Sequence, residues 1–266
     1  MGLYNDIQDV DALYPWVLLP QSIYPVDMRS FHLAHTGFVV YGDLGLPHKA
    51  GTLSWQAYAG SRSQDPDEGF VESLLEDGIV LGDASGPTWG GDVRWKAPVS
   101  GLLLGASYLK STLNAPGATI GGLPAASELK YTTEDFYAEF ERGKLKLDAE
   151  LNLEPSYQRF GVPQFTYSPS HVWYVMGSWH FTEKLTGGMY YSSDLGYDSG
   201  NRDRNDPANY SKDTALNGRY DFNSHVYAKL EGHYVSGTAN YFYDIDNVNG
   251  LAKVSKLLVA RVGFSF

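Results

Sequence analysis

The sequence predicts an all-β fold made of antiparallel strands. Residues 145–154, Leu-Lys-Leu-Asp-Ala-Glu-Leu-Asn-Leu-Glu, alternate apolar and polar side chains at every position. Because successive side chains of a strand point to opposite faces, this pattern predicts a strand with one apolar and one polar face. A helix would scatter both sets of side chains around its circumference. The same alternation recurs at 89–97, at 226–234 and at the end of the chain, in 258–266.

Eleven segments carry a pattern of this kind. In chain order, we expect strands near 34–44, 50–60, 88–97, 101–110, 129–142, 144–155, 170–182, 184–194, 209–222, 224–235 and 253–266. These segments hold ten to fourteen residues, whereas strands of soluble proteins average about 5–6 residues. A tilted strand that crosses a membrane needs about 9–11 residues. Strand length therefore favours a membrane-spanning sheet over a soluble β-sandwich, whose strands also alternate.

The connections between these segments are alternately short and long. The short ones are 45–49, 98–100, 142–143, 183 and 223, and the long ones are 61–87, 111–128, 156–169, 195–208 and 236–252. Outer-membrane barrels combine short periplasmic turns with long extracellular loops, and a soluble sandwich has no reason to keep this parity. The sequence therefore predicts an antiparallel transmembrane β-barrel with about 11–12 strands in this chain.

Composition excludes several other classes of protein. The 266 residues include no cysteine, which rules out disulfide scaffolds, thiolate metal sites and cysteine nucleophiles. There are 20 Lys and Arg against 31 Asp and Glu, and the resulting net charge of −11 argues against a nucleic-acid partner, which requires a basic face. No apolar stretch approaches the length of a transmembrane helix. Aromatic residues, at 14%, are too abundant for a disordered chain.

The first part of the chain departs from the strand pattern. Pro15, Pro20 and Pro25 break it, so we expect residues 1–33 to form an extracellular-type loop segment and 34–266 to form the barrel domain. Bacterial single-chain barrels have an even number of strands, whereas eleven is odd. A further strand could lie around 13–19. Because no signal peptide follows Met1, we favour a chain truncated at its N-terminus, which belongs to a barrel of about 16 strands.

The end of the chain, Arg261-Val-Gly-Phe-Ser-Phe266, resembles the closing strand of Gram-negative outer-membrane proteins, which ends in Phe after alternate apolar or aromatic residues. This resemblance implies location in the outer membrane and an insertion machinery that reads the Phe266 strand. Residues 3–6, Leu-Tyr-Asn-Asp, and 18–24, Leu-Leu-Pro-Gln-Ser-Ile-Tyr, are similar to a loop of porin-like proteins of the proteobacterial and phosphate-selective type. That similarity implies a porin. The lysine-lined anion path of the family has no matching lysine cluster here.

The two faces of the predicted strands differ in character. Aromatic rings recur near strand ends on the face expected to meet lipid, where they suit the headgroup boundary. These rings are Trp89, Tyr108, Phe136, Phe140, Trp179, Phe181, Tyr191, Tyr220, Phe222, Tyr234, Phe264 and Phe266. If the strands instead packed as a sandwich, these rings would fill its core.

The opposite face carries the strand charges and would line the lumen. Its acids are Asp43, Asp92, Asp135, Glu139, Glu141, Asp148, Glu150, Glu154, Asp194, Asp213, Asp221 and Glu231, and its bases are Arg94, Lys96, Lys146, Lys184, Arg219, Lys229 and Arg261. Charges inside a barrel need water or partners. The acidic surplus favours a water-filled pore with a mild cation preference. The candidate pore-lining residues are Asp92, Arg94, Lys96, Lys146, Asp148, Glu150, Arg219, Lys229, Glu231 and Arg261.

We therefore expect an outer-membrane porin for passive diffusion of small hydrophilic solutes or ions, with no enzymatic activity, metal or cofactor. His233 and Ser236 are three residues apart, so on a strand they point to opposite faces and cannot act as a catalytic pair. Two alternatives stay open: a barrel enzyme or adhesion barrel with a plugged lumen, and a soluble β-sandwich binding module. The expected partners are outer-membrane lipid, the insertion machinery and the solutes, and association as a homotrimer is left open.

Overall fold

The computed structural model describes residues 2–5, 7, 10–26, 35–64, 75, 78–124, 127–160, 165–167, 170–195, 203, 205–239 and 247–264. Its main element is a 12-stranded sheet in which antiparallel strands follow one another in chain order. In sheet order the long strands are β1 (Thr36–Gly45), β2 (Thr52–Gln64), β4 (Ala84–Lys96), β5 (Leu102–Ala115), β8 (Ser127–Arg142), β9 (Leu145–Phe160), β11 (Ser170–His180), β12 (Leu185–Leu195), β13 (Tyr210–Asp221), β14 (Val226–Gly237) and β15 (Val254–Phe264), while β10 (Phe165–Tyr167) pairs with β9. All eleven predicted strands are confirmed, with ends that differ by a few residues.

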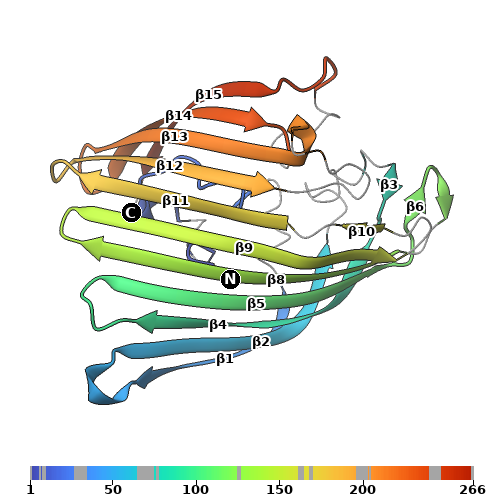
Figure 1. The fold of residues 1–266 in the computed structure, drawn as a ribbon, viewed down its shortest axis with the longest axis horizontal. Helices are drawn as coiled ribbons and strands as arrows, with labels where there is room; N and C mark the ends of the chain where they lie inside the picture. Colours follow the sequence, from blue (N-terminus) through green and yellow to red (C-terminus); the bar gives the residue numbers. More distant parts are fainter. Residues whose placement is uncertain are drawn as a thin grey trace.

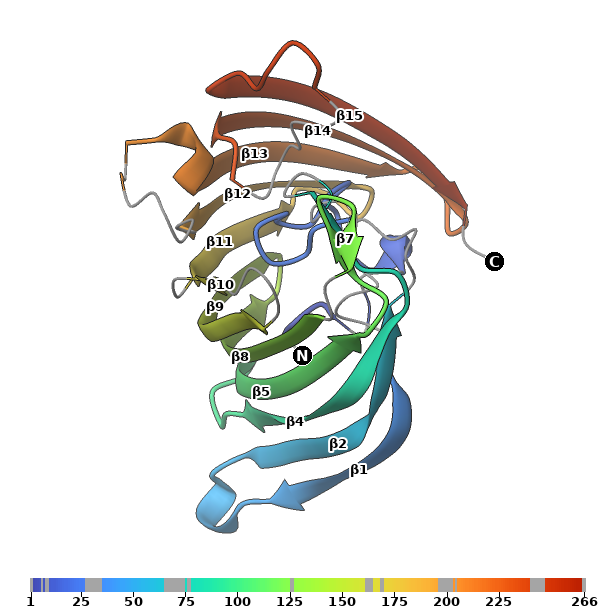
Figure 2. The same ribbon diagram turned by 90° about the vertical axis from the view of Figure 1, so that its right-hand side faces the viewer.

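The sheet is strongly curved (Figure 1). Figure 2 shows it as an arc with β1 at one end and β15 at the other, so that it has a concave and a convex face. Within the described part of the chain, β1 and β15 do not pair with each other, and the arc is open between them. This architecture is one bent sheet and not two sheets packed face to face, as the sandwich alternative requires.

Strand β14 illustrates how the alternation in sequence sorts side chains between the two faces. Lys229 and Glu231 point to the concave face and are 2% and 0% exposed, whereas Leu230 between them points outward and is 54% exposed. The outward side chains are largely apolar. The backbone hydrogen-bond donors and acceptors of β14 are satisfied by its pairing with β13 and β15. Lipid is a suitable surrounding for such a face.

The aromatic residues predicted to face lipid lie on the convex face wherever the structure describes them. Nine of them are exposed, from 36% at Tyr191 to 65% at Phe264: Trp89, Phe136, Trp179, Phe181, Tyr191, Tyr220, Phe222, Tyr234 and Phe264. Tyr108 and Phe140 are partly buried. Phe266 lies outside the described residues.

The parity of short and long connections is also confirmed. The short connections join β1 to β2, β4 to β5, β8 to β9, β11 to β12 and β13 to β14, and they lie at one end of the sheet (Figure 1). Gly101, in the turn before β5, has φ +87°, and a Cβ there would lie 1.8 Å from the carbonyl oxygen of Glu141. Glycine is therefore required at this turn.

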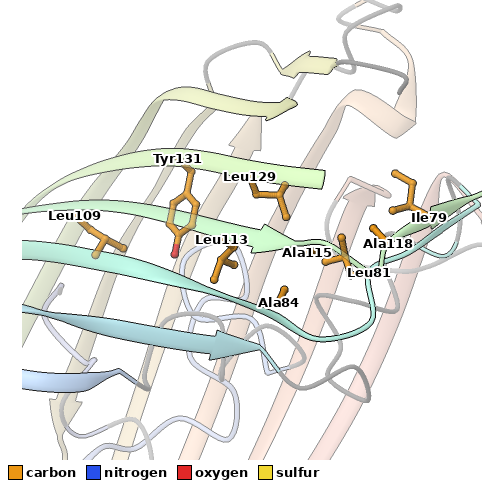
Figure 3. Close-up of a cluster of buried hydrophobic side chains, with 9 residues drawn as sticks. All are labelled: Ile79, Leu81, Ala84, Leu109, Leu113, Ala115, Ala118, Leu129 and Tyr131. Atoms are coloured by element: carbon orange, nitrogen blue, oxygen red, sulfur yellow. The ribbon is translucent and has the colours of Figure 1, made fainter. Parts of the chain in front are cut away.

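Short elements lie mainly in the long connections. β3 (Ile79–Val80), β6 (Thr119–Ile120) and β7 (Leu123–Pro124) form a second, three-stranded sheet. Next to it lies an apolar cluster on the concave side (Figure 3), made of Ile79, Leu81, Ala84, Leu109, Leu113, Ala115, Ala118, Leu129 and Tyr131. These strands and β10 were not predicted, because two or three residues are too few to show an alternation.

The helical elements with defined bounds are three 3₁₀ turns: η1 (Asp11–Leu13), η2 (Pro47–Lys49) and η3 (Pro207–Asn209). Among the residues that the structure describes, no helix has the length and apolar character needed to cross a membrane.

Candidate functional site

A chain segment crosses the concave face of the sheet. We give the name inner strap to the described residues of the segment 2–26, which are 2–5, 7 and 10–26; they are dark blue and lie inside the arc in Figure 2. Its described residues include η1 and no strand, so a hidden strand around 13–19 is not found. Residues 1–33 were expected to form an extracellular-type loop segment. The described residues of the strap pack against the inner wall of the sheet. That residues 1–33 form an extracellular-type loop segment stays a prediction.

Asp11 anchors the inner strap to β14 and β15. Its carboxylate accepts hydrogen bonds from Lys229 Nζ (2.9 Å), Tyr227 Oη (2.7 Å) and Arg261 Nη1 (2.7 Å). Burial acts to raise the pKa of Asp11, but these three donors outweigh it, so that the pKa is lowered. Asp11 is therefore ionised at neutral pH, and an ionic contact holds this end of the strap.

Beyond Asp11, four wall side chains bind the main chain of the strap between residues 11 and 18. Three of them donate to strap carbonyl oxygens, and one accepts from strap amides. The contacts are Asn217 Nδ2 to Pro15 O (2.7 Å), Arg219 Nη1 to Ala12 O (2.7 Å) and Tyr14 O (3.1 Å), Lys229 Nζ to Asp11 O (2.6 Å) and Trp16 O (2.9 Å), and Val17 N (2.9 Å) and Leu18 N (3.0 Å) to the Glu231 carboxylate. The strap is thus held through its peptide groups.

Tyrosine hydroxyls form a second anchor on β9. Tyr4 donates to Asp148 (2.7 Å), and both Tyr24 of the strap (2.6 Å) and Tyr174 of β11 (2.7 Å) donate to Glu150. Burial, followed by the charge of Asp148, raises the pKa of Tyr4 well above its usual value. The phenol therefore keeps its proton and remains a donor to the carboxylate.

Between the two anchors, Trp16 fills an aromatic pocket. Its ring lies 5.2 Å from the ring of Tyr190 at an interplanar angle of 61°, an edge-to-face contact. Trp16 is 1% exposed and belongs to an apolar cluster with Tyr174, Met176 and other strap residues. Gly188 on β12 leaves the room for this ring, because a Cβ there would lie 2.9 Å from Cη2 of Trp16.

The structure places all ten predicted pore-lining residues on the concave face. Seven of them form hydrogen bonds with the strap: Arg94, Asp148, Glu150, Arg219, Lys229, Glu231 and Arg261. The other three lie nearby. Asp92 accepts from Arg94 (2.8 Å) and from Tyr137 (2.5 Å), Lys146 pairs with Glu139 (2.7 Å), and Lys96 is exposed at the end of β4. Whether these residues line a pore stays a prediction.

The strap changes which of these charges can meet solvent. Asp148 and Glu150 are 4% and 3% exposed, and Glu231 is fully buried. By contrast, the side chain of Arg94 is 27% exposed, and both members of the Lys146–Glu139 pair are 25% exposed. The buried carboxylates hold the strap, and the charges that still reach solvent are of both signs.

His233 connects the strap contact to the next strand. Its Nδ1 lies 2.9 Å from Asp213 on β13, and its Nε2 lies 3.0 Å from the Glu231 carboxylate that binds the strap. Tyr190 also donates to Asp213, over 2.8 Å. The imidazole therefore lies between two carboxylates, one of which receives the strap amides.

The sequence reading missed two kinds of residue at this site. The first is the strap itself, including Asp11 and Trp16. The second is the set of concave-face tyrosines that donate to carboxylates: Tyr137, Tyr174, Tyr190 and Tyr227. A signal for the second kind was present, because Tyr137 stands at the same parity along β8 as Asp135 and Glu139.

No protein-family model and no curated protein matches the sequence. Solved structures do match the fold. In-vitro folded OmpT, an outer membrane protein of Vibrio cholerae, matches with a TM-score of 0.50 and 10% identity over 86% of this chain and 76% of that chain. OmpT expressed in the outer membrane of the same organism gives a TM-score of 0.47 at 10% identity, over 88% and 78%. A FadL homologue of Pseudomonas aeruginosa gives 0.44 at 13% identity, over 76% and 60%.

The chain has the fold of an outer-membrane β-barrel protein. The likeness to OmpT of Vibrio cholerae, at this identity, concerns the fold alone. The lengths of the strands, the apolar convex face and the polar concave face agree with it on physical grounds. Bacterial barrels of this fold reside in the outer membrane.

Proposed function

We propose that the chain forms the barrel of an outer-membrane porin, a pore for passive diffusion of small hydrophilic solutes or ions that the inner strap narrows. The observation that carries this proposal is the partly exposed charge on the concave face beside the strap, at Arg94, Lys146 and Glu139. Partly exposed charges inside a barrel require water, and a continuous water column is a path for solutes. An interior filled with apolar side chains alone would not support the proposal.

The sequence suggests a mild cation preference, based on a surplus of acids. Several of those acids, including Asp148 and Glu231, lie beneath the strap. The more exposed charges include bases as well as acids, so we expect a weak preference that reversal potentials in a salt gradient can measure.

Single-channel recording in planar bilayers tests the pore. Folded protein should give discrete conductance steps, and Glu231→Ala, which removes the acceptor of two strap amides, should enlarge them. Leu230→Ala is the matched control, because Leu230 is the chain neighbour of Glu231 and faces outward. Protein that is folded by heat-modifiable gel migration and still gives no steps would contradict the proposal.

One observation favours the alternative of a barrel with a plugged lumen. The contacts of the strap extend from β4 and β5, where Gly2 meets Arg94 and Ser107, to Arg261 on β15. If the strap closes the path completely, native protein is silent and Glu231→Ala opens it. The same recordings therefore separate a narrowed pore from a plugged barrel.

We also propose that the insertion machinery of the outer membrane reads the last strand, whose final residue, Phe266, lies outside the described part. Phe266→Ala should lower the amount of folded protein in the outer membrane. The homotrimer is a further proposal, which the mass of the protein in detergent can test.

A further inference from the structure

The concave wall binds residues 11–18 of the inner strap through many contacts to their peptide groups. Seven hydrogen bonds join the side chains of Asn217, Arg219, Lys229 and Glu231 to peptide groups of residues 11–18. Each residue of a peptide other than proline offers one such donor and one such acceptor. Hydrogen bonds to the main chain of a peptide give affinity, and pockets for individual side chains give selectivity.

Two strap side chains supply the selective part. Asp11 meets Lys229, Tyr227 and Arg261, as described above, and Trp16, five residues later, fills the pocket beside Tyr190. Leu13, which lies between them, is 60% exposed. The wall therefore reads an acid and, five positions later, an aromatic ring. Between them, the ring of Tyr14 is also buried and lies 4.8 Å from Lys229 Nζ.

The strap is attached by contacts that an outside molecule can replace. Within its described residues, the strap pairs with no strand. Its peptide groups are bound by wall side chains, those of Asn217, Arg219, Lys229 and Glu231. A segment of the same chain binds at a high effective concentration compared with a free peptide. A free peptide therefore competes poorly with the native strap and well with a weakened one.

We infer that Asn217, Arg219, Lys229 and Glu231, together with the Trp16 pocket, form a binding site for oligopeptides, which residues 11–18, beginning with the 3₁₀ turn η1, occupy as an internal stand-in. The ligand class is a peptide with an acidic residue and an aromatic residue five positions later. This inference goes beyond the proposed pore and does not depend on conductance.

The test uses full-length protein in detergent and a fluorescein-labelled synthetic peptide with the sequence of residues 10–20. The protein variant is Trp16→Ala, which empties the aromatic pocket, and heat-modifiable gel migration establishes that it is folded. Asp11→Asn is a second variant, which leaves the pocket filled and frees Lys229 and Arg261. Two altered peptides accompany the native one: Trp16→Ala as the disabled ligand and Leu13→Ala as the matched control.

Fluorescence anisotropy should show that the native peptide binds a folded variant at least about tenfold more tightly than it binds the native protein. Against the Trp16→Ala protein, the Trp16→Ala peptide should bind at least about tenfold more weakly than the native peptide, as expected for a buried aromatic anchor, and the Leu13→Ala peptide should bind within about twofold of it. Absence of binding to both folded variants overturns the inference. Equal binding of the native and Trp16→Ala peptides also overturns it, because the site would then be unselective.

Discussion

Strands β1 and β14 follow the same alternation but differ in what covers their inner faces. On β1 the inward side chains of Val39 and Tyr41 are 52% and 77% exposed, whereas on β14 those of Lys229 and Glu231 are at most 2% exposed. Both strands pair antiparallel, but β1 ends the arc and pairs with β2 alone, whereas β14 pairs with β13 and β15. The inner strap adds to this difference, because its hydrogen bonds reach β13, β14 and β15 and cover the inner face there. Alternation decides which face a side chain takes, and the strap decides whether that face is buried.

The largest loss of stability is expected when a buried charge beneath the inner strap is removed. Glu231→Ala leaves the amides of Val17 and Leu18 and the Nε2 of His233 without their carboxylate. Breaking a buried charged contact from one side costs about 3–5 kcal/mol of unfolding free energy. Urea unfolding in lipid vesicles measures this loss, and a loss below about 1 kcal/mol would mean that the strap does not depend on Glu231.

A smaller effect is expected from filling the pocket of Trp16. A Cβ at Gly188 would lie 2.8 Å from the carbonyl oxygen of Gly177 and 2.9 Å from the Trp16 ring, so Gly188→Val should destabilise the fold by about 1–3 kcal/mol. Gly218→Val is the control, because a Cβ there meets nothing within 4 Å. The fluorescence of Trp16 should change in the first variant, and equal stability of the two variants would contradict the packing described.

The anchor at Asp11 predicts a dependence on pH. Because the folded pKa of Asp11 is lowered below its ordinary value of 3.8, the anchor stabilises the fold fully above that value and less as the pH falls through the folded pKa. Asp11→Asn should therefore cost about 1 kcal/mol at pH 7, since the pair is partly exposed and screened. The difference from the native protein should vanish in strong acid. A difference that persists unchanged below pH 2 would show that the anchor is not ionic.

The smallest effect belongs to the uncovered side. Asp43 on β1 is exposed and accepts a hydrogen bond from Ser54 (2.5 Å). Asp43→Asn should change the unfolding free energy by no more than about 0.5 kcal/mol, as surface substitutions usually do. A cost comparable to that of Glu231→Ala would show that β1 is also covered, which would remove the contrast between the two regions.

Local alternation made the strands and their faces predictable. In 226–234 it placed Lys229 and Glu231 on the inner face, where the structure has them. The same reasoning could not find the strap, because Pro15, Pro20 and Pro25 remove any periodicity from it. The contacts of the strap join residues far apart in sequence, such as Val17 and Glu231, which are 214 positions apart. No local pattern encodes such a pair, so the contact cannot be predicted from the sequence alone.

The length of that separation also bears on the order in which the protein folds. The strap precedes β1 in the chain, but its partners Lys229, Glu231 and Arg261 lie on the last two strands, so it cannot lock in place until those strands have formed. The entropy cost of closing so large a loop grows only slowly with its length, whereas contacts this distant in sequence make folding slow. Residues 11–18 therefore reach these contacts only after the last two strands have formed, although they precede every long strand in this sequence.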